Sequence, residues 1–307
     1  MIETRTTPAQ ESSFDGPGAI SMSQADFQRI AGRVQEDYGI HLPQAKKDLV
    51  YSRLLRRVRF HGFVDFGTYC DHVESVAGVP ERTEMLSALT TNVTHFFREK
   101  HHFDLLSSSV LPPLLDAARR GGRVRLWSAG CSSGQEAYSL ALTVLALCPD
   151  AARYDIRILA TDIDPKIVAR AQEAVYPAAE RAAIGEPLLS RFTESEPEGD
   201  SFRIAASARA LVSFATLNLI GEWPVRGPFD VIMCRNVAIY FGDAAQHRLW
   251  QRFTSFMQPG AHLFIGHSER IVGPAEARLE NVGITAYRVL QQRDGTGQRP
   301  DTKGATK

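Results

Sequence analysis

The amino-acid sequence predicts an all-α N-terminal domain followed by an α/β domain with a Rossmann-like, mostly parallel sheet. Two observations support this assignment. Apolar residues recur at helical spacing between residues 23 and 89, and short β-rich runs alternate with helical stretches after about residue 123. The length of 307 residues, 44% of them hydrophobic and 23% charged, suits two globular domains and excludes a wholly disordered or fibrous chain.

The helical domain is expected at residues 21–89 as a bundle of about four helices, because its apolar positions follow the helical repeat and turn residues separate the segments. Ser23 precedes the first helix with Asp26 three residues further on, which is close to a capping box. Asp65 is placed to cap the third helix.

The α/β domain is expected at residues 90–290, with a linker motif at 90–100. Its strand-like and helix-like segments follow one another as VRLWSAG, QEAYSLALTVLAL, IRILATD, PKIVARAQEAV, FDVIMCR, AAQHRLWQRFTSFM and AHLFIGH. Short strands around FRIA and LVSFATL interrupt this order and predict a small antiparallel β-insertion at about 177–213. Ligands of such sheets bind beyond the carboxyl ends of the strands. The positions of interest are therefore 128–134, 162–164, 235–240 and 266–269.

Both ends of the chain are polar, and residues 1–20 and 291–307 are expected to be disordered because they bury too little apolar surface. No apolar run reaches the roughly 20 residues of a membrane span, and the start of the chain lacks the apolar centre of a signal peptide. We therefore expect a cytoplasmic monomer that does not insert into a membrane.

Charge and cysteine content exclude further classes of protein. The 35 basic and 35 acidic residues cancel, so no overall field favours nucleic acid. The four cysteines form no CxxC pair, which argues against a zinc site and for reduced thiols: Cys70, Cys131, Cys148 and Cys234. We expect no metal.

Polar residues follow the predicted strands. The turn from Gly130 to Gly134 allows close approach of a ligand to the backbone and to a helix N-terminus, although a packing role is the alternative. Its GxxxG spacing differs from the GxGxxG of turns that bind NAD. Asp162 and Asp164 end the next strand, where a carboxylate accepts hydrogen bonds from a ribose diol. Asp164 before Pro165 also fits a helix N-cap.

Two later strands end in similar residues. Arg235 and Asn236 follow FDVIMCR, with Tyr240 shortly after, and charged and amide side chains beside a buried strand favour a functional role over loop bracing. Asn218 ends LVSFATLNL, where ligand binding and a turn role are equally favoured. Near the linker, the polar Asn92, Thr94 and Arg98 stand beside Phe96 and Phe97, whose expected role is packing, and polar residues in this setting suit the lining of a cleft.

Four segments, in this order, resemble the chemotaxis receptor methyltransferases of the CheR family: TNVTHFFRE, RLWSAGCSSGQEAYSLAL, ILATDIDPKIVARA and CRNVAIYF. The resemblance covers about residues 25 to 290. It implies a protein-glutamate O-methyltransferase that transfers methyl from S-adenosyl-L-methionine to glutamates of methyl-accepting chemotaxis receptors and releases S-adenosyl-L-homocysteine. The implied partner is an acidic, helical, cytoplasmic region of the receptor, and no nucleic acid is implied.

The resemblance also implies site residues. The cofactor would be contacted by Asn92, Thr94 and Arg98 from the linker, by Gly130, by Glu136 and Asp162 at its methionine and ribose portions, and by Asn218 and Leu219 near the adenine. Arg235, Asn236 and Tyr240 would surround the reacting end, with Arg98 and Tyr240 as the catalytic, orienting pair. Gln135, Ala137 and Ala238 differ from the residues usual in the family, and TESEPEGDSFRI lacks the Gly-x-Gly element of its tether-binding subset.

A glutamate acceptor suits a site without a general base, because its carboxylate is already an anion far above a reference pKa of about 4.3. His95, His101 and His267 are accordingly expected to be structural. A silent S-adenosylmethionine sensor or adaptor is an alternative, disfavoured by the intact Arg98, Asp162 and Tyr240.

A basic run on the N-terminal domain is the candidate docking surface for the receptor: Lys46, Lys47, Arg53, Arg56, Arg57 and Arg59. Helical spacing places several of these residues on one face, while Leu49, Leu54, Leu55 and Val58 are expected to face the bundle. The alternatives are a solvated helix face and the footprint of a nucleic-acid methyltransferase.

Overall fold

The computed structural model describes residues 20–197 and 199–291. The disorder expected at 1–20 and 291–307 therefore falls outside the described residues, apart from Ile20 and Gln291. The chain divides into two compact units. The first comprises the residues up to Gln35 together with Leu42–Thr90, and the second comprises Glu36–His41 and the residues from Thr91 onward. Within the described ranges, no helix combines the length and the apolar character that crossing a membrane requires.

The first unit is the all-α domain that the sequence predicts. Its elements are α1 (Gln24–Tyr38), whose last turn belongs to the second unit, η1 (Gln44–Lys46), α2 (Lys47–Phe60), α3 (Phe66–Glu74) and α4 (Val79–Leu89). The predicted capping box is present, because the Ser23 N–H donates to Asp26 Oδ2 at 2.9 Å and the Asp26 N–H donates to Ser23 Oγ at 3.1 Å. Asp65 caps α3 by accepting the Thr68 N–H at 2.7 Å.

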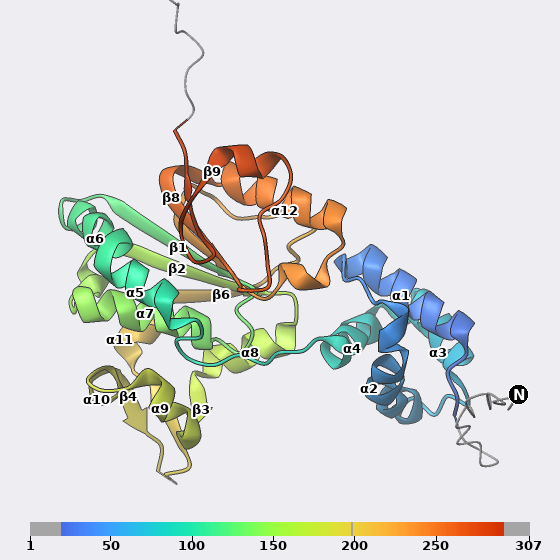
Figure 1. The fold of residues 1–307 in the computed structure, drawn as a ribbon. Helices are drawn as coiled ribbons and strands as arrows, with labels where there is room; N and C mark the ends of the chain where they lie inside the picture. The colour runs from blue at the N-terminus through green and yellow to red at the C-terminus, as the bar shows by residue number, and fades with distance from the viewer. Residues whose placement is uncertain (1–19, 198, 292–307) are drawn as a thin grey trace, which may run out of the picture. The chain divides into compact units, whose positions relative to one another are not determined.

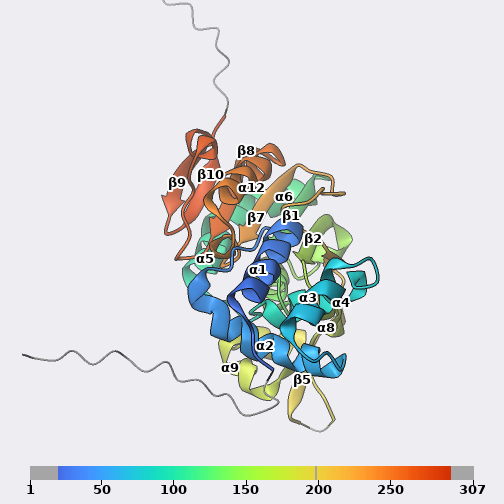
Figure 2. The same cartoon turned by 90° about the vertical axis from the view of Figure 1, so that its right-hand side faces the viewer.

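The second unit is built on a seven-stranded sheet in the order β6-β2-β1-β7-β8-β10-β9 (Figures 1 and 2). The strands are β1 (Arg123–Ala129), β2 (Asp155–Asp162), β6 (Val212–Thr216), β7 (Phe229–Cys234), β8 (Met257–Ile265), β9 (Leu279–Gly283) and β10 (Ala286–Val289). The first five are mutually parallel, whereas β10 is antiparallel to both β8 and β9. The β9–β10 hairpin could not be predicted from the sequence, because its short strands lack a clear apolar alternation.

Helices cover both faces of this sheet (Figure 1). The main ones are α5 (Lys100–Leu105), the π-helical η2 (Leu106–Val110), α6 (Leu111–Arg119), α7 (Gln135–Leu147), α8 (Pro165–Glu173) and α12 (Asp243–Ser255). Short 3₁₀ turns add η3 (Ala151–Arg153), η5 (Ala238–Tyr240) and η6 (Pro274–Arg278). Alternate residues of β1 enter different cores: Leu126 packs with α6 and α7, and Trp127 packs with α12. This two-sided burial explains why the strands are almost continuously apolar.

A separate three-stranded antiparallel sheet, ordered β3-β5-β4, forms the predicted insertion. It consists of β3 (Val175–Pro177), β4 (Thr193–Ser195) and β5 (Ser201–Ile204), with η4 (Ala178–Glu180), α9 (Arg181–Ile184), α10 (Leu188–Phe192) and α11 (Ala206–Arg209) around it. The segment LVSFAT does not belong to this insertion. It forms β6, parallel to β2 in the main sheet.

Candidate functional site

The carboxyl ends of four adjacent parallel strands bring the predicted site segments to one edge of the sheet. Strand β1 leads to Gly130, β2 ends at Asp162, β7 leads to Arg235 and β8 leads to Gly266. Ligands of open α/β sheets bind at such an edge.

The turn between β1 and α7 requires glycine at its first position. Gly130 has a φ of 88°, and a Cβ there would lie 2.3 Å from Cγ2 of Val237, so a larger residue would be both strained and obstructed. The turn is tied to the next strand, because the Ser132 N–H donates to Asp162 Oδ2 at 2.8 Å. The N-terminus of α7 therefore lies at the site edge, where it favours an anionic or polar ligand.

Asp162, the last residue of β2, and Asp164 have different roles. Asp164 is 3% exposed and caps α8 by accepting the Lys166 N–H at 3.0 Å, as its position before Pro165 predicts. Asp162 accepts the Ser132 and Asp164 backbone N–H groups, one on each carboxylate oxygen. A carboxylate has about four acceptor positions, so Asp162 retains acceptor capacity for a ligand. Burial raises the pKa of Asp162 above its ordinary value. Asp162 is therefore the better candidate for a ribose contact.

Arg235 forms the charged centre of the site. Its side chain is 2% exposed, with Nη1 3.3 Å from Glu136 Oε2 and Nε 3.4 Å from Glu99 Oε2, and its Nη2 donates to the Arg98 carbonyl. Burial raises the pKa of Glu136, and the charge of Arg235 opposes that rise. Burial would also raise the pKa of Glu99, but hydrogen bonds from His267 and the charge of Arg235 hold it below its ordinary value.

The linker motif lies beside the β1–α7 turn. Ser132 Oγ donates to the Asn92 carbonyl at 3.0 Å, and the Asn92 side-chain amide lies 3.5 Å from Asp164 Oδ2. Arg98 is half-buried and donates to the Val93 carbonyl at 3.3 Å, and Thr94 is also half-buried. Asn92 and the Arg98 backbone, which accepts from Arg235, therefore lie at the same edge as Asp162.

Glu269 lies in the segment 266–269 that the sequence marks as a position of interest, although the sequence predicts no role for it. Its carboxylate is buried and accepts backbone N–H groups from Asn236, Val237, Ala238 and Ile239, and also from Gly266, at 2.5 to 3.3 Å. Burial raises its pKa and these hydrogen bonds lower it, with a net rise. Its position just beyond the carboxyl end of β8 marks it as a site candidate, but its backbone partners at 236–239 are about 30 residues away in the sequence and could not be predicted. Glu269 fixes the loop that carries Asn236 and Tyr240.

The loop itself presents a polar acceptor. Asn236 has a φ of 59°, and its buried Oδ1 has no hydrogen-bond partner within the described residues. Tyr240 is half-buried, and its carbonyl accepts the His41 N–H at 2.8 Å. An unpartnered buried acceptor at this edge is suited to a ligand donor, since leaving it unsatisfied costs about 1–3 kcal/mol.

For Asn218, the turn role is confirmed. Its Oδ1 accepts the Ile220 N–H at 3.1 Å and its Nδ2 donates to the Asp37 carbonyl at 2.9 Å. Leu219 is 5% exposed, and its carbonyl accepts the Trp223 indole N–H at 3.2 Å. Any adenine contact here would involve the backbone and the apolar surface of Leu219 more than the Asn218 side chain.

Glu99, His101 and His102 bring three potential metal-ligand atoms within 4.8 Å of one another. A cation there would compete with Arg235, whose guanidinium already lies 3.4 Å from the Glu99 carboxylate. His267 Nδ1 is 2.9 Å from the other oxygen of Glu99. These contacts define an ion-pair network around Glu99.

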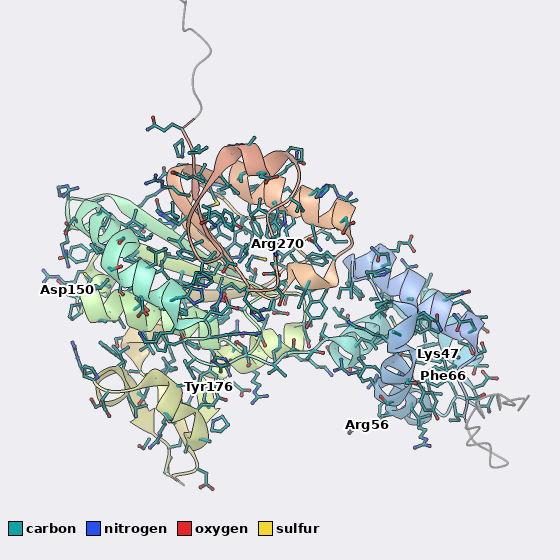
Figure 3. All side chains as sticks on the ribbon, viewed as in Figure 1. Lys47, Arg56, Phe66, Asp150, Tyr176 and Arg270 are labelled. Atoms are coloured by element: carbon teal, nitrogen blue, oxygen red, sulfur yellow. The ribbon has the colours of Figure 1, made fainter. Side chains whose placement is uncertain are left out.

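The basic run divides into residues used within the helical domain and residues that remain exposed. Arg57 donates to the buried Glu81, and Arg53 donates to the Leu89 carbonyl at 2.5 Å, so both brace α2 against α4. Arg56 and Arg59 are exposed on α2, whereas Lys46 and Lys47 are half-buried (Figure 3 labels Lys47 and Arg56). The prediction that Leu49 faces the bundle is wrong, because it is 42% exposed at the first turn of the helix.

Comparison with known proteins assigns the chain to a family. The protein-family model described as "CheR methyltransferase, SAM binding domain" matches residues 92–288, and the family model described as "CheR methyltransferase, all-alpha domain" matches residues 25–90. The chain belongs to the CheR methyltransferase family.

Its relatives carry corresponding names. A "Probable chemotaxis protein methyltransferase" of Rhizobium etli is 49% identical over 83% of this chain and 96% of its own length. The "Chemotaxis protein methyltransferase" of Escherichia coli is 38% identical over 87% and 92% of the two chains. "Chemotaxis protein methyltransferase 2" of Pseudomonas aeruginosa is 37% identical over 86% and 93%. The chain is thus an S-adenosylmethionine-dependent chemotaxis methyltransferase.

Proposed function

We propose that this CheR-family enzyme methylates glutamate side chains of methyl-accepting chemotaxis receptors in the cytoplasm, giving glutamyl methyl esters and S-adenosylhomocysteine. One observation carries the choice of a carboxylate acceptor: the carboxylates of the described site edge already have partners. Arg235 and Ser128 engage Glu136, Arg235 and His267 engage Glu99, and backbone N–H groups engage Asp162 and Glu269. An acceptor that needs no deprotonation fits this site best.

S-adenosylmethionine supplies a methyl group on a positively charged sulfonium sulfur. The receptor carboxylate oxygen attacks the methyl carbon, the carbon–sulfur bond breaks, and the products are a neutral ester and a neutral thioether. No proton moves in this step. Because the two charges cancel, water stabilises the separated reactants more than the transition state, and an oriented, water-poor site accelerates the reaction.

The site residues have distinct proposed roles. Glu136, held by Arg235, receives the ammonium group of the methionine portion, and Asp162 receives the ribose hydroxyls. Asn92 and Thr94 line the cofactor from the linker beside Gly130, and Leu219 covers the adenine. Asn236 lies by the reacting end, where Arg98 and Tyr240 orient the incoming carboxylate.

The test uses labelled S-adenosylmethionine and cytoplasmic receptor fragments. We expect label on the fragment that mild alkali releases as methanol, because esters hydrolyse in alkali and N-methyl groups do not. A fragment whose glutamates are changed to glutamine is the control and should remain unlabelled. Label that survives alkali would contradict glutamate methylation and indicate an amine or a ring nitrogen as acceptor.

The ribose assignment has its own test. Asp162→Asn removes the charge of an acceptor for two hydroxyls, and charged hydrogen bonds contribute about 1.5–3 kcal/mol, so the dissociation constant for S-adenosylhomocysteine should rise roughly 10- to 150-fold. Asp150→Asn, half-exposed before the amino end of β2, is the matched control and should leave the dissociation constant unchanged. Calorimetry that finds equal affinity for Asp162→Asn and wild type would refute the assignment.

A further inference from the structure

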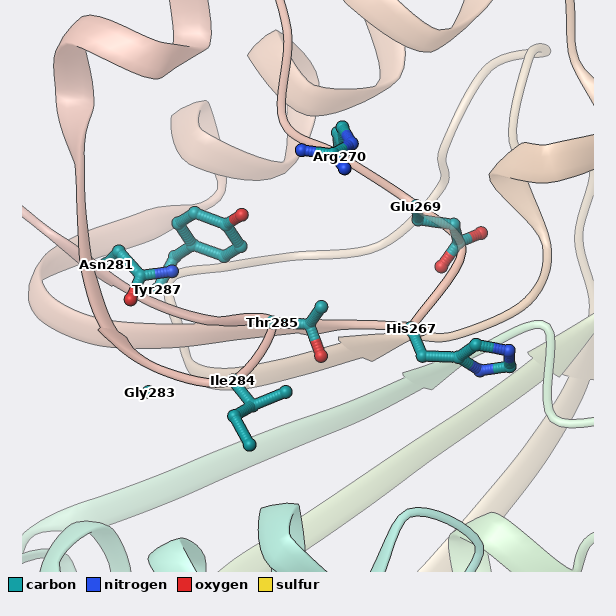
Figure 4. Close-up of a pocket in the computed structure, with 8 residues that line it drawn as sticks. All are labelled: His267, Glu269, Arg270, Asn281, Gly283, Ile284, Thr285 and Tyr287. Atoms are coloured by element: carbon teal, nitrogen blue, oxygen red, sulfur yellow. The ribbon is translucent and has the colours of Figure 1, made fainter.

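A polar pocket of about 410 Å³ lies beside the site edge, between the loop that follows β8 and the β9–β10 hairpin. Figure 4 shows its lining: His267, Glu269, Arg270, Asn281, Gly283, Ile284, Thr285 and Tyr287. The proposed methyl transfer assigns no role to Arg270, Asn281 or Tyr287.

The register of the hairpin decides which side chains reach the pocket. Tyr287 pairs with Asn281 across β10 and β9, so their side chains share one face of the hairpin. The neighbouring pair, Arg288 and Glu280, points to the opposite face, where the two form an ion pair at 2.7 Å. Glu280, the acidic residue of the hairpin, is therefore paired with Arg288 on the face turned away from the pocket.

Arg270 has no hydrogen bond or ion pair from its side chain within residues 20–197 and 199–291, and it is exposed. The adjacent Glu269 does not neutralise it, because both Glu269 oxygens accept backbone N–H groups. In Figure 4 the Glu269 carboxylate points away from Asn281 and Tyr287. The pocket thus combines one cation with uncommitted donors on the Asn281 amide and the Tyr287 hydroxyl.

The pocket is joined to the reacting end by two residues of its own wall. Glu269 holds the backbone of residues 236–239, and His267 contacts Glu99 of the Arg235 network. The pocket wall is therefore bonded directly to the backbone of the loop that leads to Tyr240. A helical segment repeats its side chains every 5.4 Å, so a second acid one turn away lies within reach of a neighbouring subsite.

We propose that this pocket is a docking subsite for a second carboxylate of the methyl-accepting segment, bound by Arg270 with Asn281 and Tyr287. The inference rests on the proposed receptor-glutamate methylation. A cation with amide and hydroxyl donors, and no available acid of its own, matches a carboxylate ligand. The subsite would select acceptor glutamates that have an acidic neighbour.

Steady-state methylation of receptor fragments tests the subsite. Arg270→Ala should raise the KM for the fragment about five- to tenfold, with little change in kcat. This factor lies between the effect of losing an exposed ion pair and the effect of losing a buried charged hydrogen bond. Arg270→Lys keeps the charge and loses the forked donor geometry, so its KM should lie between those of wild type and Arg270→Ala. The control is Arg153→Ala, an exposed arginine before β2, which should leave KM unchanged. All variants should bind S-adenosylhomocysteine as wild type does.

A double-mutant cycle identifies the ligand. Each receptor glutamate outside the methylated position is changed in turn to glutamine, and KM is measured with wild type and Arg270→Ala. One change should abolish the difference between the two enzymes. An unchanged KM in Arg270→Ala, or a difference that persists through every fragment, would overturn the subsite while wild-type ester formation stands. Absence of alkali-labile label with wild type would instead refute the proposed function.

Discussion

Glu269→Gln is the substitution that most directly tests how the reacting loop is held. Glutamine has nearly the shape of glutamate, but it replaces one acceptor oxygen by a donor NH₂ group. Oε1 of Glu269 accepts the N–H groups of Val237, Ala238 and Ile239, and Oε2 accepts those of Asn236 and Gly266. The least costly orientation of glutamine places its NH₂ against the second pair.

Two buried N–H groups then lose their acceptor and face another donor. Each such loss costs about 1–3 kcal/mol, or about 2–6 kcal/mol for the pair. The burial of its charge raises the pKa of Glu269, which shows that the charge is costly to bury. Glutamine avoids this cost, and the gain offsets part of the loss of hydrogen bonds. We therefore expect the free energy of unfolding to fall by about 2–4 kcal/mol, together with kcat, because the loop that carries Asn236 and Tyr240 loses its anchor.

Urea unfolding and hydrogen exchange measure the two effects separately. The unfolding midpoint should fall, and the amide protons of residues 236–239 should exchange faster than in wild type. The exposed Glu276→Gln in η6 is the matched control and should behave as wild type. An unchanged midpoint with unchanged exchange at 236–239 would refute the anchoring role of Glu269.

Two further predictions concern the docking surface and acid stability. The double substitution Arg56→Glu and Arg59→Glu should raise the KM for receptor fragments and weaken the dependence of KM on ionic strength. Cofactor affinity should not change, because both side chains are exposed and brace no backbone group that the structure records. A KM equal to that of wild type at low salt would contradict docking at α2. Burial lowers the pKa of His102 from 6.5 to about 4, so below pH 6.5 the unfolded chain binds a proton that the folded chain does not. The free energy of unfolding should therefore fall by about 3 kcal/mol as the pH drops from 6.5 to 4. Denaturant titrations over this pH range should find a smaller fall in His102→Gln.

Local features of this protein could be predicted from the sequence because they depend on residues close together in the chain. The caps formed by Ser23 with Asp26, by Asp65 and by Asp164 need only a side chain and an N–H two or three residues away. The alternation of strands and helices follows from apolar periodicity, and parallel strands share an edge, so the positions of Asp162 and Arg235 on that edge could also be predicted.

Contacts between distant residues were decided only by the tertiary structure. Arg235 reaches Glu99 across 136 positions of sequence, and nothing local to either residue signals the pair. Likewise, Arg53 and Arg57 look equivalent to Arg56 in the sequence, yet the packing of α2 against α4 engages the first two and leaves the third exposed. The physical reason is that the partner of a charged group depends on which backbone and side-chain groups the whole fold brings within about 3 Å, and that proximity is a property of the assembled sheet and bundle.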